Sequence, residues 1–293
     1  MTVRARGIVA PSLGQAGQRR QISRGPGTWP RRVRFGPARA GKGSEVSRTV
    51  EQGDVFFFYR PRVGTDEVDE LRDVQRFFLV LMPDGRQRYR GIVVGRKRLP
   101  DPREHERVWA FVAEVGDNPQ ELHDELRRRA YETRTHGVRV QPEARPAGEG
   151  RYAIVEHNGH THLAHVLELP RQPGPAHEAF RIRPEASYIV AVRNPEAEAP
   201  PNAGLRPDQR PAYPPELQER FGDRRFIGLD DPSLLDYEGT ELVLIGAAED
   251  VESELGVELD PRDVELETAD IFRRLRIRPG ELPSEPIEQG QLR

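Results

Sequence analysis

The sequence contains no cysteine among its 293 residues. This absence excludes disulfide bonds, thiol nucleophiles and thiolate metal sites. Lysine is scarce as well, because Lys42 and Lys97 are the only lysines among 45 basic residues. The preference for arginine, together with abundant alanine, glycine and proline, indicates a GC-rich bacterial genome.

Long hydrophobic runs and familiar catalytic motifs are also missing. No apolar run approaches about 18 residues, so we expect no transmembrane helix, and the N-terminus lacks the hydrophobic block of a secretory signal. The chain has no Gly-x-Ser-x-Gly elbow, no His-Glu-x-x-His helix and no Rossmann glycine pattern after a strand. We therefore expect a soluble, cytoplasmic protein without a membrane partner, and the common hydrolase and oxidoreductase classes gain no support.

Charge is unevenly distributed along the chain. Residues 1–48 hold eleven basic residues against Glu45 alone, whereas residues 49–293 hold 34 basic and 47 acidic residues. The N-terminal stretch is rich in arginine, glycine, proline and serine, so we expect residues 1–50 to be a disordered basic extension. It can bind nucleic acid or another anionic surface by counterion release, act as a targeting segment, or be a leader translated from upstream of the true start codon.

The stretch 151–169 carries the strongest local prediction. Two apolar-rich runs, 151–157 and 160–169, flank Asn158-Gly159, the dipeptide that best tolerates the positive φ angles of a type I′ turn. A two-residue turn at this point pairs His157 with His160 in an antiparallel hairpin. Tyr152 and His165 then oppose each other on the core face, where we expect the histidine to be packed and hydrogen-bonded.

The same register places three imidazoles, those of His157, His160 and His162, on the other face at the hairpin tip. Directly opposed Cβ atoms lie about 5 Å apart and diagonal ones about 7 Å apart, so one ion can contact all three rings. We therefore predict a candidate site for a divalent metal, Zn²⁺ or Fe²⁺, with an open position for water. The competing interpretation is a polar, solvent-facing tip that binds no metal.

A second, similar hairpin is predicted over residues 76–94, around Pro83-Asp84-Gly85. Its side chains Arg86, Arg88 and Arg90 alternate along one strand, with Tyr89 between them. This pattern suits a phosphate or an RNA backbone. The competing interpretation is a charged strand face that discourages pairing at the edge of a sheet.

The fold class that these patterns indicate is α+β. Both hairpins, the aromatic run 55–59 and the run 187–192 supply about six strands, enough for a small barrel or sandwich over residues 51–195. The run 108–115 fits either a buried strand or the start of a helix. A covering helix is expected from Asp117 to about residue 133, with an inner stripe of Leu122, Leu126 and Ala130.

The chain beyond residue 195 has a different character. Residues 196–214 are rich in proline and are expected to form a linker. We expect residues 215–277 to form a small α/β segment, and residues 278–293 to form a disordered tail. The elements expected in the α/β segment are a helix over 215–221, a short strand over 225–229, an apolar strand over 241–247 and helices over 249–255 and 260–277.

These observations support three hypotheses of function. The preferred one is a non-catalytic binding or interaction module with an unknown protein or small-molecule partner. An alternative is a metal-dependent enzyme that uses His157, His160 and His162 as ligands and a metal-bound water. A further alternative is RNA binding, through Arg86, Arg88 and Arg90 or through the basic N-terminal extension.

Overall fold

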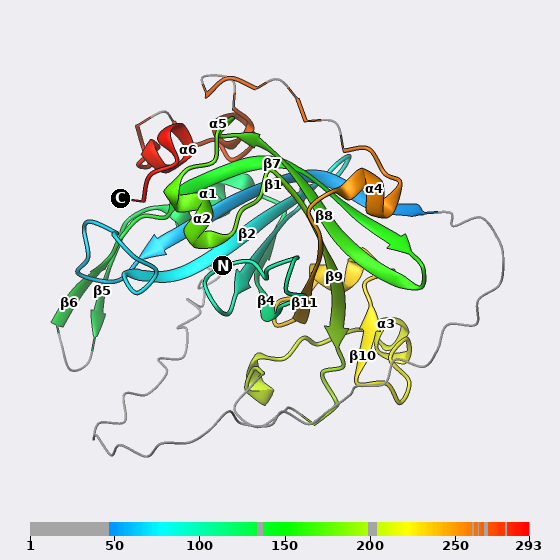
Figure 1. Cartoon of the computed structure of the whole chain (residues 1–293). Coiled ribbons are helices and arrows are strands. Elements are labelled where there is room, and N and C mark those ends of the chain that lie inside the picture. Colours follow the sequence, from blue (N-terminus) through cyan, green and yellow to red (C-terminus); the bar gives the residue numbers. More distant parts are fainter. Residues whose placement is uncertain are drawn as a thin grey trace, which may run out of the picture. The chain divides into compact units, whose positions relative to one another are not determined.

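A computed structural model of the chain describes residues 47–133, 137–198, 204–259, 261–262, 264–266, 269–278 and 280–292. The N-terminal extension predicted over residues 1–50 lies almost wholly outside the described residues. Within them, strands dominate and the helices are short (Figure 1). The strands are β1 (Arg48–Pro61), β2 (Val74–Pro83), β3 (Tyr89–Val94), β4 (Arg107–Gly116), β5 (Arg129–Thr133), β6 (Gly137–Gln141), β7 (Arg145–His157), β8 (His160–Leu169), β9 (Glu185–Arg193), β10 (Phe226–Gly228) and β11 (Glu241–Ala248). The helices are α1 (Pro119–Leu126), α2 (Pro175–Phe180), α3 (Pro215–Glu219), α4 (Val251–Leu255), α5 (Asp270–Arg274) and α6 (Glu285–Gln289), with 3₁₀ turns at Pro207–Gln209 and Pro232–Asp236.

Eight of the described strands form a closed antiparallel barrel. They follow the order β9-β11-β4-β3-β2-β1-β7-β8, and β8 pairs back onto β9. The short strand β10 pairs with the end of β9 at Arg193, Val192 and Ala191, beyond the residues that β8 occupies. Because the sheet closes on itself, these eight strands leave no long unpaired edge.

Alternation along each strand produces two hydrophobic layers. In β1, Val55, Phe57 and Tyr59 point into the barrel, whose core receives side chains from all eight barrel strands. Phe56 and Phe58 point outward and are also fully buried. A second core covers them, to which α1 and the described residues between Val264 and Ile287 contribute, so both faces of this strand are apolar.

The architecture confirms the β-rich body and both predicted hairpins, and it corrects the number of strands. The run 108–115 is strand β4, and the apolar run 241–247 is β11, which lies between β4 and β9 in the same barrel. The region 215–277, predicted as a small α/β segment after a linker, therefore contributes strand β11 to the barrel. Strand order could not be inferred, because the residues of β11 pair with residues that are 50 or more positions away in the sequence.

Three expectations about helices and ends differ from the structure. The helix expected over 117–133 is only α1, capped by Asn118, and it is followed by β5. In the part of 260–277 that the structure describes, only α5 is helical, and Asp260, the expected start, lies outside the described residues. The tail predicted to be disordered contains α6, whose Ile287 is buried in the second core.

Candidate interaction surface

The β7–β8 hairpin has the register that the sequence predicts. His157 pairs with His160 and Val155 with His162, and the turn residues Asn158 and Gly159 have φ angles of 50° and 76°. However, the outer face of this hairpin is covered near its tip. The outward side chains of β7 and β8 pack against α4 in a small third core formed by Ala153, Val155, Ala164, Val251 and Leu255.

The three histidines of the predicted metal site have different environments. His162 is 4% exposed, and burial lowers its pKa to about 4, with smaller contributions from the charges of His157 and His160. His157 Nδ1 lies 2.8 Å from Ser47 Oγ, and its Nε2 lies 2.8 Å from Asn158 Nδ2. In the described part of the chain, no group of three or more His, Asp or Glu side chains is arranged to hold a metal ion. The Zn²⁺ or Fe²⁺ hypothesis gains no geometric support.

The three arginines of the predicted RNA site do not share one surface. Arg86 is exposed in the turn, and Arg88 is half-buried with its Nε 2.8 Å from an oxygen of Asp117. Arg90 is completely buried, with Glu51 at 2.6 Å and Asp236 at 2.8 Å. Arg90 therefore belongs to an internal ion-pair group and is not accessible to a nucleic acid.

The barrel interior is filled with side chains. Its cavity has a volume of about 10 Å³ and is lined mainly by apolar side chains together with His165, Tyr152 and Tyr188. Such a volume holds about one water molecule and no organic ligand. His165 Nε2 lies 3.1 Å from the carbonyl oxygen of Arg183, and the imidazole stacks on the ring of Tyr188. As the sequence predicts, this histidine is a packed residue of the core.

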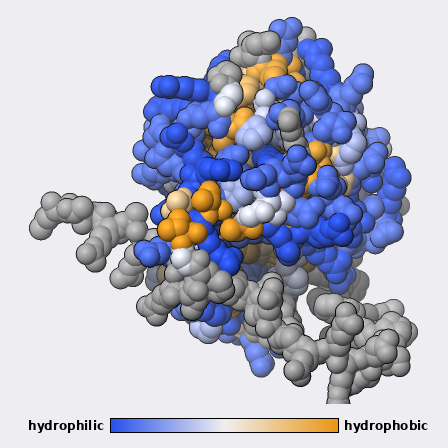
Figure 2. Space-filling model, turned by 90° about the vertical axis from the view of Figure 1, so that its left-hand side faces the viewer, coloured by the Kyte–Doolittle hydropathy of each residue, from blue (hydrophilic) through white to orange (hydrophobic). Residues whose placement is uncertain are grey.

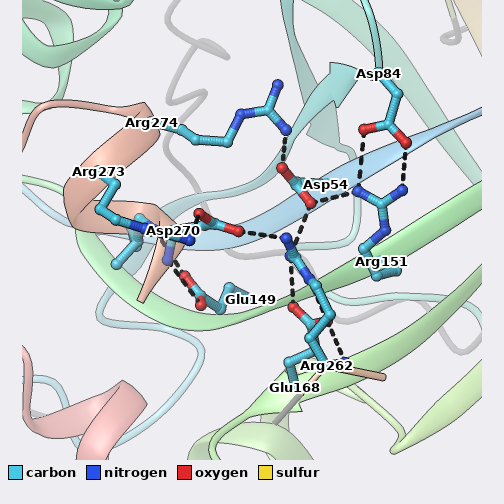
Figure 3. Close-up of polar contacts among 10 residues, drawn as sticks. Asp54, Asp84, Glu149, Arg151, Glu168, Arg262, Asp270, Arg273 and Arg274 are labelled. Carbon is cyan, nitrogen blue, oxygen red and sulfur yellow. Dashed lines mark hydrogen bonds and ion pairs between the residues drawn. The ribbon is translucent and has the colours of Figure 1, made fainter. Parts of the chain in front are cut away.

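A cluster of acidic and basic side chains joins the C-terminal segment to the outside of the barrel (Figure 3). Asp54 of β1 is 1% exposed and is contacted by Arg151, Arg262 and Arg274. Glu168 of β8 accepts hydrogen bonds from the backbone N–H of Arg262 at 2.7 Å and from its Nε and Nη2, both at 2.9 Å. We refer to this set, which also includes Asp84, Glu149, Asp270 and Arg273, as the C-terminal clamp.

Glu149 of β7 is the buried member of the clamp that contacts the backbone of α5. Its carboxylate accepts the backbone N–H groups of Asp270 and Ile271, at 3.1 and 2.8 Å, at the start of α5. Burial raises the pKa of Glu149 to about 7, although these two hydrogen bonds favour the charged form. Carboxylates and guanidinium groups are nearly balanced in number in the clamp, and the carboxylates other than Glu149 contact guanidinium groups directly. This arrangement holds the C-terminal segment in place.

The clearest exposed feature is the hairpin of β5 and β6, which we call the ribbon. Among the described residues, the large hydrophobic side chains that are exposed are Tyr131 (39%), Val138 (70%) and Val140 (39%), and all three belong to the ribbon. The ribbon forms a two-stranded sheet of its own and extends away from the barrel (Figure 1). Figure 2 shows this side of the molecule, where small hydrophobic patches interrupt a mainly hydrophilic surface.

The pairing of β5 with β6 gives the ribbon two different faces. Ala130 opposes Val140 and Glu132 opposes Val138, so one face is largely aliphatic. Tyr131 opposes Arg139, and Arg129 lies on the same face, so the other face is aromatic and basic. An exposed group of apolar side chains with a charged surround is typical of an interaction site.

Sequence reasoning missed the ribbon because Ala130 continues the helical spacing of Leu122 and Leu126. The sequence contains one signal for it, because Val138-Arg139-Val140 alternates after a glycine, Gly137. In the structure this glycine has a left-handed φ of 66°. That pattern is typical of a strand that follows a tight turn.

Comparisons with protein-family models, with curated proteins and with solved structures found no match for the chain. Across the described residues, no helix has the length and apolar character needed to cross a membrane. Any functional assignment must therefore come from the geometry of the barrel and the ribbon.

Proposed function

We propose that the chain is a non-catalytic interaction module, in which the barrel is a rigid support and the ribbon contacts a macromolecular partner. The observation that carries this proposal is the location of Tyr131, Val138 and Val140, the exposed large hydrophobic side chains of the described residues, on one hairpin. Exposed apolar surface is unfavourable in water, and its burial contributes roughly 25 cal/mol per Å². Burial of the ribbon by a partner therefore stabilises the complex.

The organisation of the remaining described residues supports the same proposal. The barrel core is closed and filled, and its cavity of about 10 Å³ is too small for a substrate. The ribbon is attached by exposed ion pairs at its base, including Arg128 with Glu143 at 3.1 Å and Arg129 with Glu125 at 3.3 Å. A projecting hairpin on a rigid barrel is well placed to reach a partner surface.

Site-specific crosslinking tests the proposal. A photo-crosslinking amino acid replaces Val138 in the full chain, and in a control it replaces Arg72, whose side chain is 75% exposed on a loop of the body. In cells that express the chain natively, we expect a discrete adduct from position 138 and none from position 72. Val140→Asp in the crosslinking chain should reduce the adduct about tenfold, because a buried carboxylate opposes docking of the aliphatic face.

Two results contradict the proposal. One is the absence of any discrete adduct from position 138. The other is an equal yield of adducts from positions 138 and 72, which indicates random collisions. Circular dichroism of the Val140→Asp chain provides the folding control, and an unchanged spectrum is expected because Val140 lies outside the cores of the described residues.

A further inference from the structure

We infer that the partner presents an acidic, extended peptide segment, which pairs with an edge of the ribbon as a third strand. This inference rests on the proposed function, because it names the chemistry of the partner that the ribbon contacts. It follows from three properties of the ribbon: its unpaired edges, its charge and its aliphatic face.

The first property is the incomplete hydrogen bonding of a two-stranded sheet. Among the described strands, β5 and β6 pair only with each other. Each strand therefore has an outer edge that can accept another strand, and isolated two-stranded hairpins are only marginally stable in water. Addition of a strand from a partner is a recurring mode of peptide recognition, in which backbone hydrogen bonds supply affinity.

The second property is charge. The described residues of this segment, 127–133 and 137–141, hold four arginines and one glutamate, although residues 49–293 as a whole are acidic. Arg128 and Arg129, 58% and 59% exposed, contact Glu143 and Glu125 at the base of the ribbon. Exposed pairs of this kind contribute little stability, so these arginines can exchange their carboxylates for those of a partner. Arg139 is also exposed and lies beside Tyr131.

The third property, the aliphatic face, favours a peptide over a nucleic acid as the partner. Val138 and Val140 share their face with Glu132, which repels phosphate groups, and this aliphatic face offers no donor to a nucleic acid. Strands of five residues span about 17 Å. A duplex, which carries one charge about every 1.7 Å, extends beyond that length and meets repulsion from the acidic body. A short segment that alternates acidic and aliphatic side chains matches both faces without that repulsion.

Fluorescence anisotropy with the full chain tests the inference directly. The probes are a labelled peptide of alternating glutamate and valine, a matched peptide of alternating lysine and valine, and single- and double-stranded oligonucleotides. We expect the glutamate peptide to bind and the lysine peptide and oligonucleotides to bind at least about tenfold more weakly. Val138→Asp and Arg139→Glu should each weaken binding of the glutamate peptide by about tenfold. Arg72→Glu makes the same charge change on the body, and its affinity should stay within about twofold of the unmodified chain.

The possible results separate this inference from the proposed function. Binding of oligonucleotides that is lost with Arg139→Glu overturns the inference, because the ribbon then binds nucleic acid, but it leaves the interaction module intact. Equal binding of the two peptides, or no binding of either, overturns the inference as well. If the chain that carries the photo-crosslinking residue at position 138 also gives no adduct, the proposed function fails together with this inference. If Arg139→Glu fails to fold, Tyr131→Ala replaces it as the ribbon variant. This substitution leaves the charge of the ribbon unchanged.

Discussion

His165 shows how the barrel interior controls a single side chain. The ring lies between Phe57, at a centroid distance of 5.2 Å, and Tyr188, at 5.9 Å. Removal from water disfavours the imidazolium, and burial therefore lowers the pKa of His165 from 6.5 to about 4, although the hydrogen bond to Arg183 opposes this shift. The ring is neutral in the folded protein at neutral pH.

The lowered pKa of His165 predicts that acid weakens the fold. In the unfolded chain this histidine takes up a proton near pH 6.5, whereas in the folded protein it resists protonation until about pH 4. Its contribution to stability is therefore complete above pH 6.5 and is lost as the pH falls towards 4, amounting to about 3 kcal/mol. We expect NMR spectra to show a neutral ring down to about pH 4. His165→Phe should unfold with a shallower dependence on pH between 6.5 and 4.

A different NMR result contradicts this account of His165. Titration of the ring near pH 6.5 in the folded protein means that the imidazole is exchanging with solvent. In that case the interior of the barrel is not closed to water around His165. Comparison with the His165→Phe variant separates this histidine from His162, whose pKa is also lowered to about 4.

At the level of elements, the C-terminal clamp fastens a segment with little regular structure onto the barrel. Arg262 contacts Asp54 at 2.9 Å, Glu168 at 2.9 Å and Asp270 at 2.6 Å. The side chains of these three carboxylates are at most 5% exposed. Asp54 keeps Arg151 and Arg274, and Asp270 keeps Arg273, but removal of Arg262 leaves the buried carboxylate of Glu168 without its guanidinium partner. An unpaired buried charge is far more costly than the loss of an exposed ion pair.

Arg262→Ala should therefore lower the free energy of unfolding by about 3 kcal/mol, as measured by chemical denaturation. The matched control is Arg48→Ala, which removes the exposed contact between Arg48 and Glu156 and should cost at most about 1 kcal/mol. Hydrogen exchange should show faster exchange in residues 264–287 of the Arg262→Ala variant. Equal effects of the two substitutions, with unchanged exchange in the C-terminal segment, contradict the role of the clamp.

Elements were predictable where their signals are local. Asn158-Gly159 determines the β7–β8 register by its turn geometry, and the alternation of Tyr152, Ile154 and Leu163 follows from it. The clamp was beyond sequence reasoning, because its contacts join residues as distant as Asp54 and Arg262. The exposure of Val138 was equally hidden, because hydrophobicity does not reveal whether a residue has a partner in the fold.

On the scale of the whole molecule, barrel closure depends on residues that follow the proline-rich region. β11 pairs with β4 from Glu241 to Ile245 and with β9 from Leu242 to Ala248. Its Leu242 and Leu244 enter the central core. Sequence alternation indicates that such a strand exists, but not that it inserts between β4 and β9, because pairing between distant segments is decided by the packing of the complete core.

This dependence predicts that the N-terminal part of the barrel does not fold by itself. A chain of residues 42–195 retains both hairpins but lacks β11, so β4 and β9 lose their shared neighbour. It also lacks the residues 264–287 that cover Phe56 and Phe58, which leaves a large apolar surface in water. We expect this chain to show no cooperative thermal unfolding and to bind a hydrophobic dye, whereas residues 42–293, which form one compact unit, should unfold cooperatively. A dispersed NMR spectrum and a cooperative transition for residues 42–195 would instead mean that β11 is an addition to a complete domain, and that the eight-stranded closure is not what stabilises it.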